Sequence, residues 1–297
     1  MEERILSLNG HDTRVMMQGT KGPALMFLHG FPEYAGAWGE VFAEMGGFRC
    51  FAPDQRGYGI SYRPEGIAEY AIGKLARDML DLIGVLDLER VHLIGHDWGA
   101  SVAYACAFAN DPRIASLTIL NGVHPIPYQR AIATGGAQCR AAQYIPWLKA
   151  AGSEDVLAAN GFERLIGMFS ANMDMSWLSG GRLDAYKAAW GDAEGVGAMI
   201  NWYRASPLVV GKPGEPLPAD DVPDWPAERM VVRVPHLLLW GAGDTALLPE
   251  AFEGLEDHCT AGLEITHIDG TDHWLHHQRP HEVAERVRAF VERIDVP

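Results

Sequence analysis

The residues best suited to chemistry lie in a glycine-flanked segment at 95–99, with the sequence Gly-His-Asp-Trp-Gly. An apolar run, Val91–Ile94, precedes the segment, and Gly99–Asn110, a stretch of small residues typical of a helix, follows it. In a strand-to-helix turn with the pattern small-x-nucleophile-x-small, the central side chain is exposed for reaction. Glycine is needed on both sides because larger side chains would clash with the neighbouring strand or helix. The central residue is Asp97, so the pattern predicts a carboxylate nucleophile at a helix N-terminus, where the helix dipole favours negative charge.

Asp97 alone could equally be a helix-capping residue. A nucleophile of this kind needs a base and an acid that orients the base, close in space but not in sequence. The apolar run Leu237–Trp240 leads into Asp244, and Leu263–Ile268 leads into His273. The chain order nucleophile, acid, histidine is the one expected for such a turn. We therefore predict Asp97, Asp244 and His273 as nucleophile, orienting acid and base.

Neighbouring residues narrow this assignment. The other position for the acid, after the run Ala115–Leu120, holds Asn121 and Gly122. Twelve histidines make any single one weak evidence, and we expect the three that follow His273 on its helical side to be solvated: His276, His277 and His281. The sequence shows no metal-ligand spacing such as His-Glu-x-x-His, so we expect neither a metal nor a cofactor.

Negative charge that develops during reaction needs backbone N–H donors. One donor would be the amide of Trp98, directly after Asp97. The second would be the amide of Phe31, in the loop after the apolar run Ala24–His29. Pro32 fixes this loop and could be cis.

The elements that must position these groups alternate between strands and helices. A helical spacing of apolar residues runs from Ile72 to Leu86, and another helix is expected from about His281 to Ile294. Such alternation predicts an α/β fold with a mostly parallel sheet and helices on both faces. The expected strands are Val15–Gln18, Ala24–His29, Arg49–Pro53, Val91–Gly95, Ala115–Leu120, Pro235–Gly241 and Leu263–Ile268.

The alternation stops between residues 123 and 232. This stretch holds helix-like segments followed by a Pro/Gly-rich run, residues 207–226. A helical insertion between two strands predicts a lid over the carboxyl edge of the sheet, where ligands bind in open α/β sheets. We expect a core formed by 1–122 and 233–297 and a lid formed by 123–232. The helix-like segments are Ala131–Ala151, Asp155–Ser170, Leu183–Trp190 and Val196–Ala205.

Charge, hydropathy and cysteine spacing argue against several kinds of partner and location. The 297 residues carry a formal net charge of -15, which disfavours nucleic acid and anionic membrane surfaces as partners. No apolar stretch approaches the roughly 20 residues of a membrane span, and no secretory signal is expected. The four cysteines form no Cys-x-x-Cys pair, so the simplest location is a reducing cytoplasm. Homodimer formation stays open.

Taken together, these motifs resemble the epoxide hydrolase branch of the α/β-hydrolases. The resemblance lies in residues 29–33 (His-Gly-Phe-Pro-Glu), 54–59 (Asp-Gln-Arg-Gly-Tyr-Gly), 95–99, 201–205 (Asn-Trp-Tyr-Arg-Ala), 240–244 and 272–274. It implies an α/β-hydrolase fold, a small apolar epoxide and water as reactants, and a vicinal diol as product. The carboxylate of Asp97 would form an ester with the opened epoxide, and His273, oriented by Asp244, would activate water to hydrolyse it.

The resemblance also implies two lid tyrosines that hydrogen-bond the epoxide oxygen, because an alkoxide is a poor leaving group. Tyr203 matches the second tyrosine. Tyr144 matches the first, in the segment Tyr-Ile-Pro-Trp at 144–147, and Tyr128 is the fallback. The predicted pocket side chains are Trp98, Phe31, Trp147 and Trp274.

Other functions fit part of the pattern. A haloalkane or haloacetate dehalogenase would use the same nucleophile, acid and histidine. Phe31 stands where many haloalkane dehalogenases have a halide-binding asparagine, and Trp98 and Ser101 stand where haloacetate dehalogenases have arginines. A non-catalytic binding protein would have lost one of the three reactive groups, and a serine esterase would need serine in place of Asp97. Which epoxide is bound cannot be read from the sequence.

Overall fold

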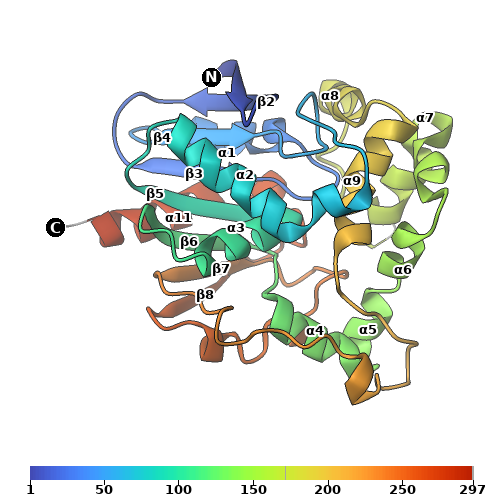
Figure 1. The fold of residues 1–297 in the computed structure, drawn as a ribbon. Coiled ribbons are helices and arrows are strands. Elements are labelled where there is room, and N and C mark those ends of the chain that lie inside the picture. The colour runs from blue at the N-terminus through green and yellow to red at the C-terminus, as the bar shows by residue number, and fades with distance from the viewer. Residues whose placement is uncertain (171, 296–297) are drawn as a thin grey trace.

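Within residues 1–170 and 172–295, which this computed structural model describes, eight strands form one sheet at the centre of the molecule (Figure 1). The strand order is β1-β2-β4-β3-β5-β6-β7-β8. β2 is antiparallel to both neighbours, and from β4 to β8 all strands are parallel. The strands are β1 Glu2–Leu8, β2 His11–Gln18, β3 Ala24–Leu28, β4 Arg49–Pro53, β5 Val91–His96, β6 Ile114–Leu120, β7 His236–Trp240 and β8 Leu263–His267.

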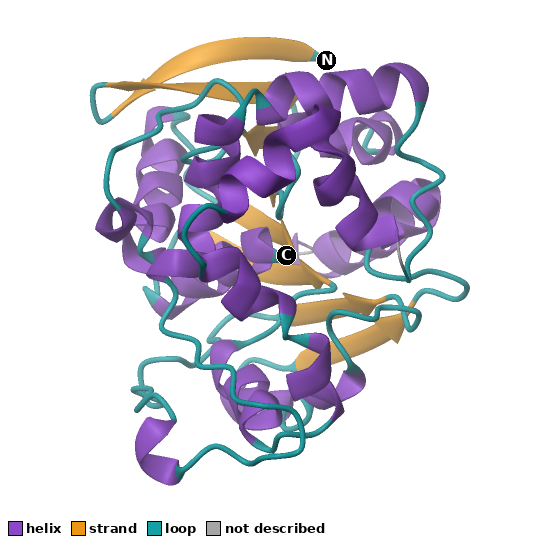
Figure 2. Ribbon diagram, turned by 90° about the vertical axis from the view of Figure 1, so that its right-hand side faces the viewer, coloured by secondary structure: helices purple, strands orange, loops and turns teal. Residues whose placement is uncertain are grey.

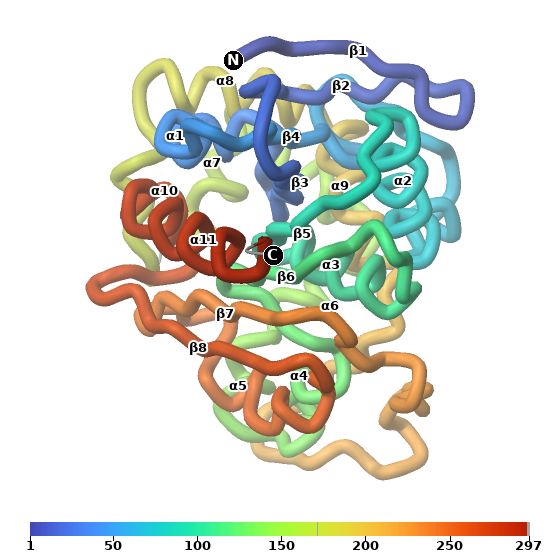
Figure 3. Tube along the Cα trace, turned by 90° about the vertical axis from the view of Figure 1, so that its left-hand side faces the viewer, coloured from blue at the N-terminus to red at the C-terminus, as the bar shows by residue number. Residues whose placement is uncertain are grey.

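Helices cover both faces of this sheet. Figure 3, turned by 90° from the view of Figure 1, shows α2 and α3 on one face and α1, α10 and α11 on the other. These helices are α1 Gly39–Glu44, α2 Ile72–Val85, α3 Trp98–Phe108, α10 Leu275–Gln278 and α11 Pro280–Asp295. Short 3-10 helices complete the connections: η1 Ala35–Trp38, η2 Ile67–Tyr70, η3 Ala219–Asp221, η4 Pro249–Phe252 and η5 Leu255–His258.

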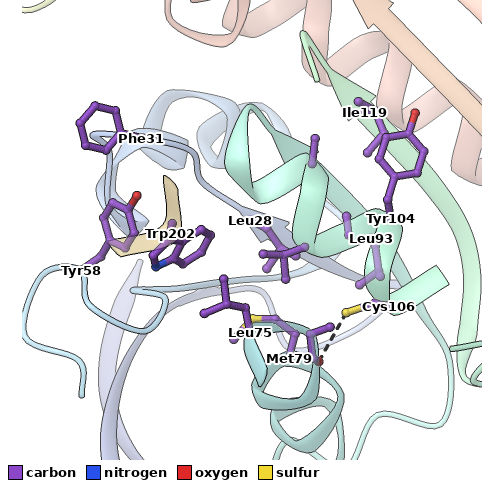
Figure 4. Packing of buried hydrophobic residues seen from close by; sticks show 14 of the residues in the cluster. Leu28, Phe31, Tyr58, Leu75, Met79, Leu93, Tyr104, Cys106, Ile119 and Trp202 are labelled. Atoms are coloured by element: carbon purple, nitrogen blue, oxygen red, sulfur yellow. Dashed lines mark hydrogen bonds between the residues drawn. The ribbon is translucent and has the colours of Figure 1, made fainter. Parts of the chain in front are cut away.

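Each face of the sheet has its own apolar core because side chains alternate along a strand. On β5, Leu93 packs with α2 and α3, whereas Ile94 packs on the face of α1 and α11. Leu75 and Met79 of α2 are one helical turn apart and both buried. Figure 4 shows them facing β3 and β5 together with Cys106 of α3. This packing fixes the carboxyl ends of the central strands, from which the site is built.

A group of helices follows β6 and precedes β7 in the sequence. They are α4 Pro125–Ala133, α5 Ala137–Ala141, α6 Tyr144–Lys149, α7 Ser153–Ser170, α8 Gly180–Trp190 and α9 Ala193–Ala205. Figure 2 shows helices of this group in front of the strand ends. α9 is tied to the core by Trp202, whose indole N–H donates to the carbonyl of Arg56 at 2.9 Å.

The structure confirms the predicted fold class. The first strand, β1, was not predicted: most of its side chains are exposed, so its sequence lacks an apolar face. A single helix over Ala131–Ala151 is wrong, because Gly135, with φ 70°, and Gly136 separate α4 from α5. The helix over Asp155–Ser170 is interrupted at residues 159–162, which have non-helical backbone angles.

None of the helices within the described residues is both long enough and apolar enough to cross a membrane.

Candidate active site

Asp97 occupies the sharp turn between β5 and α3. Its φ of 49° and ψ of −117° lie outside the regions that non-glycine residues favour. A Cβ atom added to Gly95 would lie 2.6 Å from the carbonyl oxygen of Gly99, and one added to Gly99 would lie 2.0 Å from that of Leu28. The close approach of backbone on both sides explains why glycine flanks the turn. The carboxylate is thereby held at the carboxyl edge of the sheet.

The structure brings the three predicted reactive groups together. His273 follows β8, and its Nε2 lies 3.7 Å from Oδ2 of Asp97. Asp244 follows β7, and its Oδ2 lies 2.7 Å from Nδ1 of His273. The histidine can therefore be oriented from one side while its other nitrogen faces the carboxylate and the space beside it.

Asp244 is held by donors that the sequence analysis did not identify. Nδ2 of Asn121 donates to its Oδ2 at 2.8 Å, and the amides of Ala246 and Leu247 donate to its Oδ1 at 2.8 and 2.9 Å. Asn121 also bonds both ways with Gly241, at the start of the loop that carries Asp244. Asn121, at the alternative acid position, thus holds Asp244 in place. Its position directly after β6 was the signal in the sequence that could have indicated this role.

Burial and charge tune the three groups differently. Burial raises the pKa of Asp97 above its ordinary value, although His273 and the amides of Phe31 and Trp98 oppose this rise. Burial alone would lower the pKa of His273, but Asp244 and then Asp97 raise it to about 9. Burial alone would raise the pKa of Asp244, yet His273 and the hydrogen bonds around it hold that pKa below its usual value. At neutral pH the raised pKa of His273 therefore keeps this imidazole protonated, between Asp244 and Asp97.

The two predicted backbone donors point at the nucleophile. The amide of Phe31 donates to Oδ1 of Asp97 at 2.7 Å, and the amide of Trp98 also hydrogen-bonds this carboxylate. The Phe31–Pro32 peptide bond is cis, a point that the sequence left open. Gly30 is required beside them, because a Cβ there would lie 2.4 Å from Cβ of Asp97.

Tyr203 of α9 and Tyr144 of α6 face the nucleophile from the inserted helices. The Tyr203 ring packs edge-on against Phe31 and Trp98, with centroid distances of 5.2 and 4.9 Å. The centroids of Tyr144 and Tyr203 are 6.1 Å apart. Burial raises the pKa of both hydroxyls well above the ordinary value, so both remain protonated donors. The hydroxyl of the fallback, Tyr128, lies beside that of Tyr144, which partly opposes the rise that burial causes in the pKa of Tyr128.

Two cavities meet at these groups, because Asp97, Tyr144 and Tyr203 line both. One, of about 120 Å³, also contains Trp98 and Tyr128 and is otherwise almost entirely apolar. The other, of about 180 Å³, contains His273 and more polar groups, and includes Phe31. Tyr128 lines only the first cavity, which favours Tyr144 as the second hydroxyl at the junction.

Two of the predicted pocket tryptophans lie elsewhere. Trp147 is outside the lining of both cavities, where Arg164 lies over its ring at 5.7 Å. Trp274 is fully buried beside His273, with a centroid distance of 4.8 Å, and faces Phe169 and Trp177. The sequence around Trp147 and Trp274 did not indicate toward which side of the structure each ring would point.

Comparison with known proteins agrees with this geometry. The family described as alpha/beta hydrolase fold matches residues 23–280. The chain belongs to the α/β-hydrolase superfamily. It is 28% identical to the AB hydrolase superfamily protein YfhM of Bacillus subtilis, over 97% of each chain.

Among solved structures, an epoxide hydrolase of Bacillus megaterium in complex with an inhibitor has a TM-score of 0.87 and 25% identity, over 97% of this chain and all of that one. A structure described under novel epoxide hydrolases of the α/β-hydrolase superfamily, from metagenomes of hot environments, has a TM-score of 0.85 and 31% identity, over 99% and 98% of the two chains. The chain thus falls in the epoxide hydrolase branch of the superfamily.

Behind the site of this α/β-hydrolase lies a second polar cluster, centred on the buried Glu33. The expectation that His276 and His277 are solvated is wrong: both are buried, and both Nε2 atoms contact Oε1 of Glu33, at 3.1 and 2.8 Å. They lie three and four residues after His273, a spacing that places side chains on one helical face, and this was the missed signal. His281 is exposed, as expected, with 80% of its side chain accessible.

The cluster also reaches the reactive histidine. Nδ1 of His96 lies 2.8 Å from Oε2 of Glu33, and Nε2 of His96 donates to the carbonyl of His273 at 2.9 Å. Glu33 and His96 lie in the motifs at 29–33 and 95–99, but their sequence context predicted no role for either side chain. In the described part of the chain, Glu33, His276 and His277 form the one group of three side chains spaced closely enough to hold a metal ion.

Proposed function

We propose that this protein is an epoxide hydrolase that converts an epoxide to a vicinal diol through an ester on Asp97. The observation that carries the proposal is the junction of the two cavities. There a partly buried carboxylate and two tyrosines line the same space, and a histidine oriented by Asp244 lies beside the carboxylate. A nucleophile and protonated donors that line one space are what ring opening of an epoxide requires.

In the first half-reaction, Oδ2 of Asp97 attacks an epoxide carbon, since Oδ1 is engaged by the amide of Phe31. A new C–O bond forms to the carboxylate, and the ring C–O bond breaks. The electron pair of that bond goes to the epoxide oxygen, which takes a proton from one of Tyr203 and Tyr144 and a hydrogen bond from the other. The proton that His273 gives up before the next step restores the phenol, through solvent. The product of this step is a hydroxyalkyl ester of Asp97.

In the second half-reaction, water attacks the carbonyl carbon of the ester and gives a proton to Nε2 of His273. Negative charge develops on the ester carbonyl oxygen, which the amides of Phe31 and Trp98 stabilise. Collapse of the tetrahedral intermediate breaks the bond to the diol oxygen. The diol leaves with a proton, and the carboxylate of Asp97 is regenerated with one oxygen from water.

The change of Asp97 from anion to ester prepares His273 for its task. Asp244 and Asp97 together raise the pKa of His273 to about 9. Esterification removes the negative charge of Asp97, so the pKa of His273 falls and the imidazole can act as a base near neutral pH. Asp244 keeps the ring oriented throughout.

The two cavities suggest how a substrate lies. The apolar cavity continues along α3 past Ala105 and Phe108 to Trp225, and fits a long or aromatic substituent. The other cavity, with His273, would hold the hydrolytic water and a smaller substituent. We propose that residues 123–232, which supply both tyrosines, act as the lid over the core.

The test is intact-mass analysis of His273→Gln after incubation with matched panels of apolar epoxides and haloalkanes. We expect an adduct with the mass of the epoxide, mapped to Asp97 by peptide sequencing. His281→Gln is the matched control, since His281 is exposed, and it should turn over epoxide without an adduct. Adducts from haloalkanes alone would establish a dehalogenase instead, and adducts from neither panel would indicate a binding protein.

We further propose a cytoplasmic location. It is supported by the four cysteines, all of which are free, three of them buried.

A further inference from the structure

Both carboxylate oxygens of the Glu33 side chain lie within hydrogen-bond distance of several polar groups. Its Oε2 contacts the amide of Gly30 at 3.4 Å and Nδ1 of His96 at 2.8 Å. Its Oε1 contacts three further groups: Nε2 of His276 at 3.1 Å, Nε2 of His277 at 2.8 Å and the hydroxyl of Tyr186 at 3.1 Å. An ionised carboxylate has about four lone-pair sites. Five polar contacts to one buried carboxylate mark a position that the fold holds in place.

One of these donors comes from the inserted helices. Tyr186 lies on α8, and Trp190, one turn further on, donates its indole N–H to the carbonyl of Pro32. One face of α8 thus hydrogen-bonds two successive residues, Pro32 and Glu33, of the loop that follows β3. His277 joins this contact, since its Nε2 lies 3.1 Å from the Tyr186 hydroxyl and its ring stacks on Trp177 at 3.7 Å.

In ester formation this loop only positions Asp97, through the amide of Phe31, whereas in ester hydrolysis it acts directly. It carries Phe31, whose amide would stabilise the oxyanion of the tetrahedral intermediate. Through His96, Glu33 is also connected to the backbone carbonyl of His273, the base of that step. Attack on the epoxide forms no tetrahedral intermediate. It therefore needs no donor for the charge of such an intermediate, and it needs no base.

We propose that Tyr186 and His277 are positioning residues for ester hydrolysis: by fixing Glu33 they place both the Phe31 amide and His273. This inference rests on the proposed function and extends it to residues that touch no reacting atom. It gives the inserted helices a role in the second half-reaction, in addition to the tyrosines that act in the first.

A divalent cation is the competing explanation for the cluster, because the ligand atoms of Glu33, His276 and His277 lie within 4.8 Å of one another. Burial lowers the pKa of both histidines, so each is a neutral imidazole. Such a ring donates from Nε2 to an ionised carboxylate, so the Nε2 atoms of both histidines are paired without a cation. A cation would have to displace both of these bonds.

The test is single-turnover kinetics of Tyr186→Phe with an aryl epoxide, following ester formation and ester decay separately by quenched-flow mass analysis. Loss of one hydrogen bond to a charged group should slow ester hydrolysis and kcat by about tenfold. The rate of ester formation and kcat/KM should stay within about twofold of the wild type. Tyr34→Phe is the matched control, because the Tyr34 ring packs edge-on against Tyr186 at 5.1 Å and its hydroxyl is not among the described partners of the Glu33 carboxylate; it should change neither step.

A second pair of variants separates hydrogen bonding from packing. His277→Gln retains an N–H donor and should hydrolyse the ester within about threefold of the wild-type rate, whereas His277→Leu should be slowed like Tyr186→Phe.

Several results would overturn the inference. They are wild-type ester decay in Tyr186→Phe, an equal fall of kcat and kcat/KM, or stoichiometric metal in the purified protein by elemental analysis. If the wild type forms no ester from any epoxide, it is the proposed function that fails.

Discussion

Replacing the two cavity tyrosines by phenylalanine tests the proposed chemistry most directly. Tyr203 is buried between Phe31 and Trp98, and its edge-on contacts with both rings involve the aromatic ring rather than the hydroxyl. Tyr203→Phe therefore keeps the packing and removes a single donor. Tyr144→Phe does the same on the other side of the cavity junction.

The expected magnitude follows from the state of these hydroxyls. Burial raises the pKa of both well above the ordinary value, so the enzyme offers two neutral O–H donors to the developing alkoxide across the whole working pH range. Removal of one preorganised donor to an oxyanion typically costs about 10²–10³ in rate, or roughly 2.7–4 kcal/mol. We therefore expect Tyr203→Phe and Tyr144→Phe each to lower kcat/KM for epoxides by about 100-fold.

The assay is diol formation, with ester formation measured in single turnovers, because the tyrosines act in that step. Tyr128→Phe is the control: Tyr128 is next to Tyr144 but lines only the apolar cavity, so its variant should stay within about threefold of the wild type. If Tyr203→Phe keeps its rate of ester formation, the donor role is refuted. If Tyr128→Phe loses more activity than Tyr144→Phe, Tyr128 is the second donor.

Three further predictions concern the cavity, the base and the turn. Ala105→Leu narrows the apolar cavity and should lower kcat/KM for long-chain epoxides by about tenfold, while a short epoxide such as propylene oxide should react unchanged. His273 should titrate near pH 9 by NMR in the resting enzyme, whereas the acid limb of kcat should show a lower pKa, because the ester lacks the Asp97 charge; equal values would contradict this mechanism. Gly99→Ala should be destabilised in urea unfolding by more than about 2 kcal/mol, since its Cβ would meet backbone, whereas Gly39→Ala, with open space around the added atom, should unfold like the wild type.

The parts of the site that could be predicted from the sequence are those fixed by strand ends. Asp97, Asp244 and His273 each follow an apolar run that becomes a parallel strand. Parallel strands bring their carboxyl ends to one edge, so the order of the runs was sufficient to place these side chains together. The backbone donor at Phe31 was predictable for the same reason.

The parts that could not be predicted depend on the faces of helices and on long-range pairing. Nothing in the local sequence shows that the carboxylate of Glu33 meets Tyr186, which lies 153 residues away. Trp147 is an aromatic residue of the type that often lines apolar pockets. It nevertheless lies outside the lining of both cavities, with Arg164 over its ring. Such placements follow from the packing of one helix on another, which a single sequence does not encode locally.

The identity of the residue in the turn also determines what the histidine must do. A hydroxyl nucleophile would need a neutral base from the outset, because its proton has to be removed. Asp97 needs none, and the charge of a protonated His273 counteracts the rise in the pKa of Asp97 that burial causes. The same proton must leave the imidazole before water can be activated, and the lost charge of Asp97 lowers the pKa that held it there. Ester formation therefore creates the base that the next step requires, with no change of conformation.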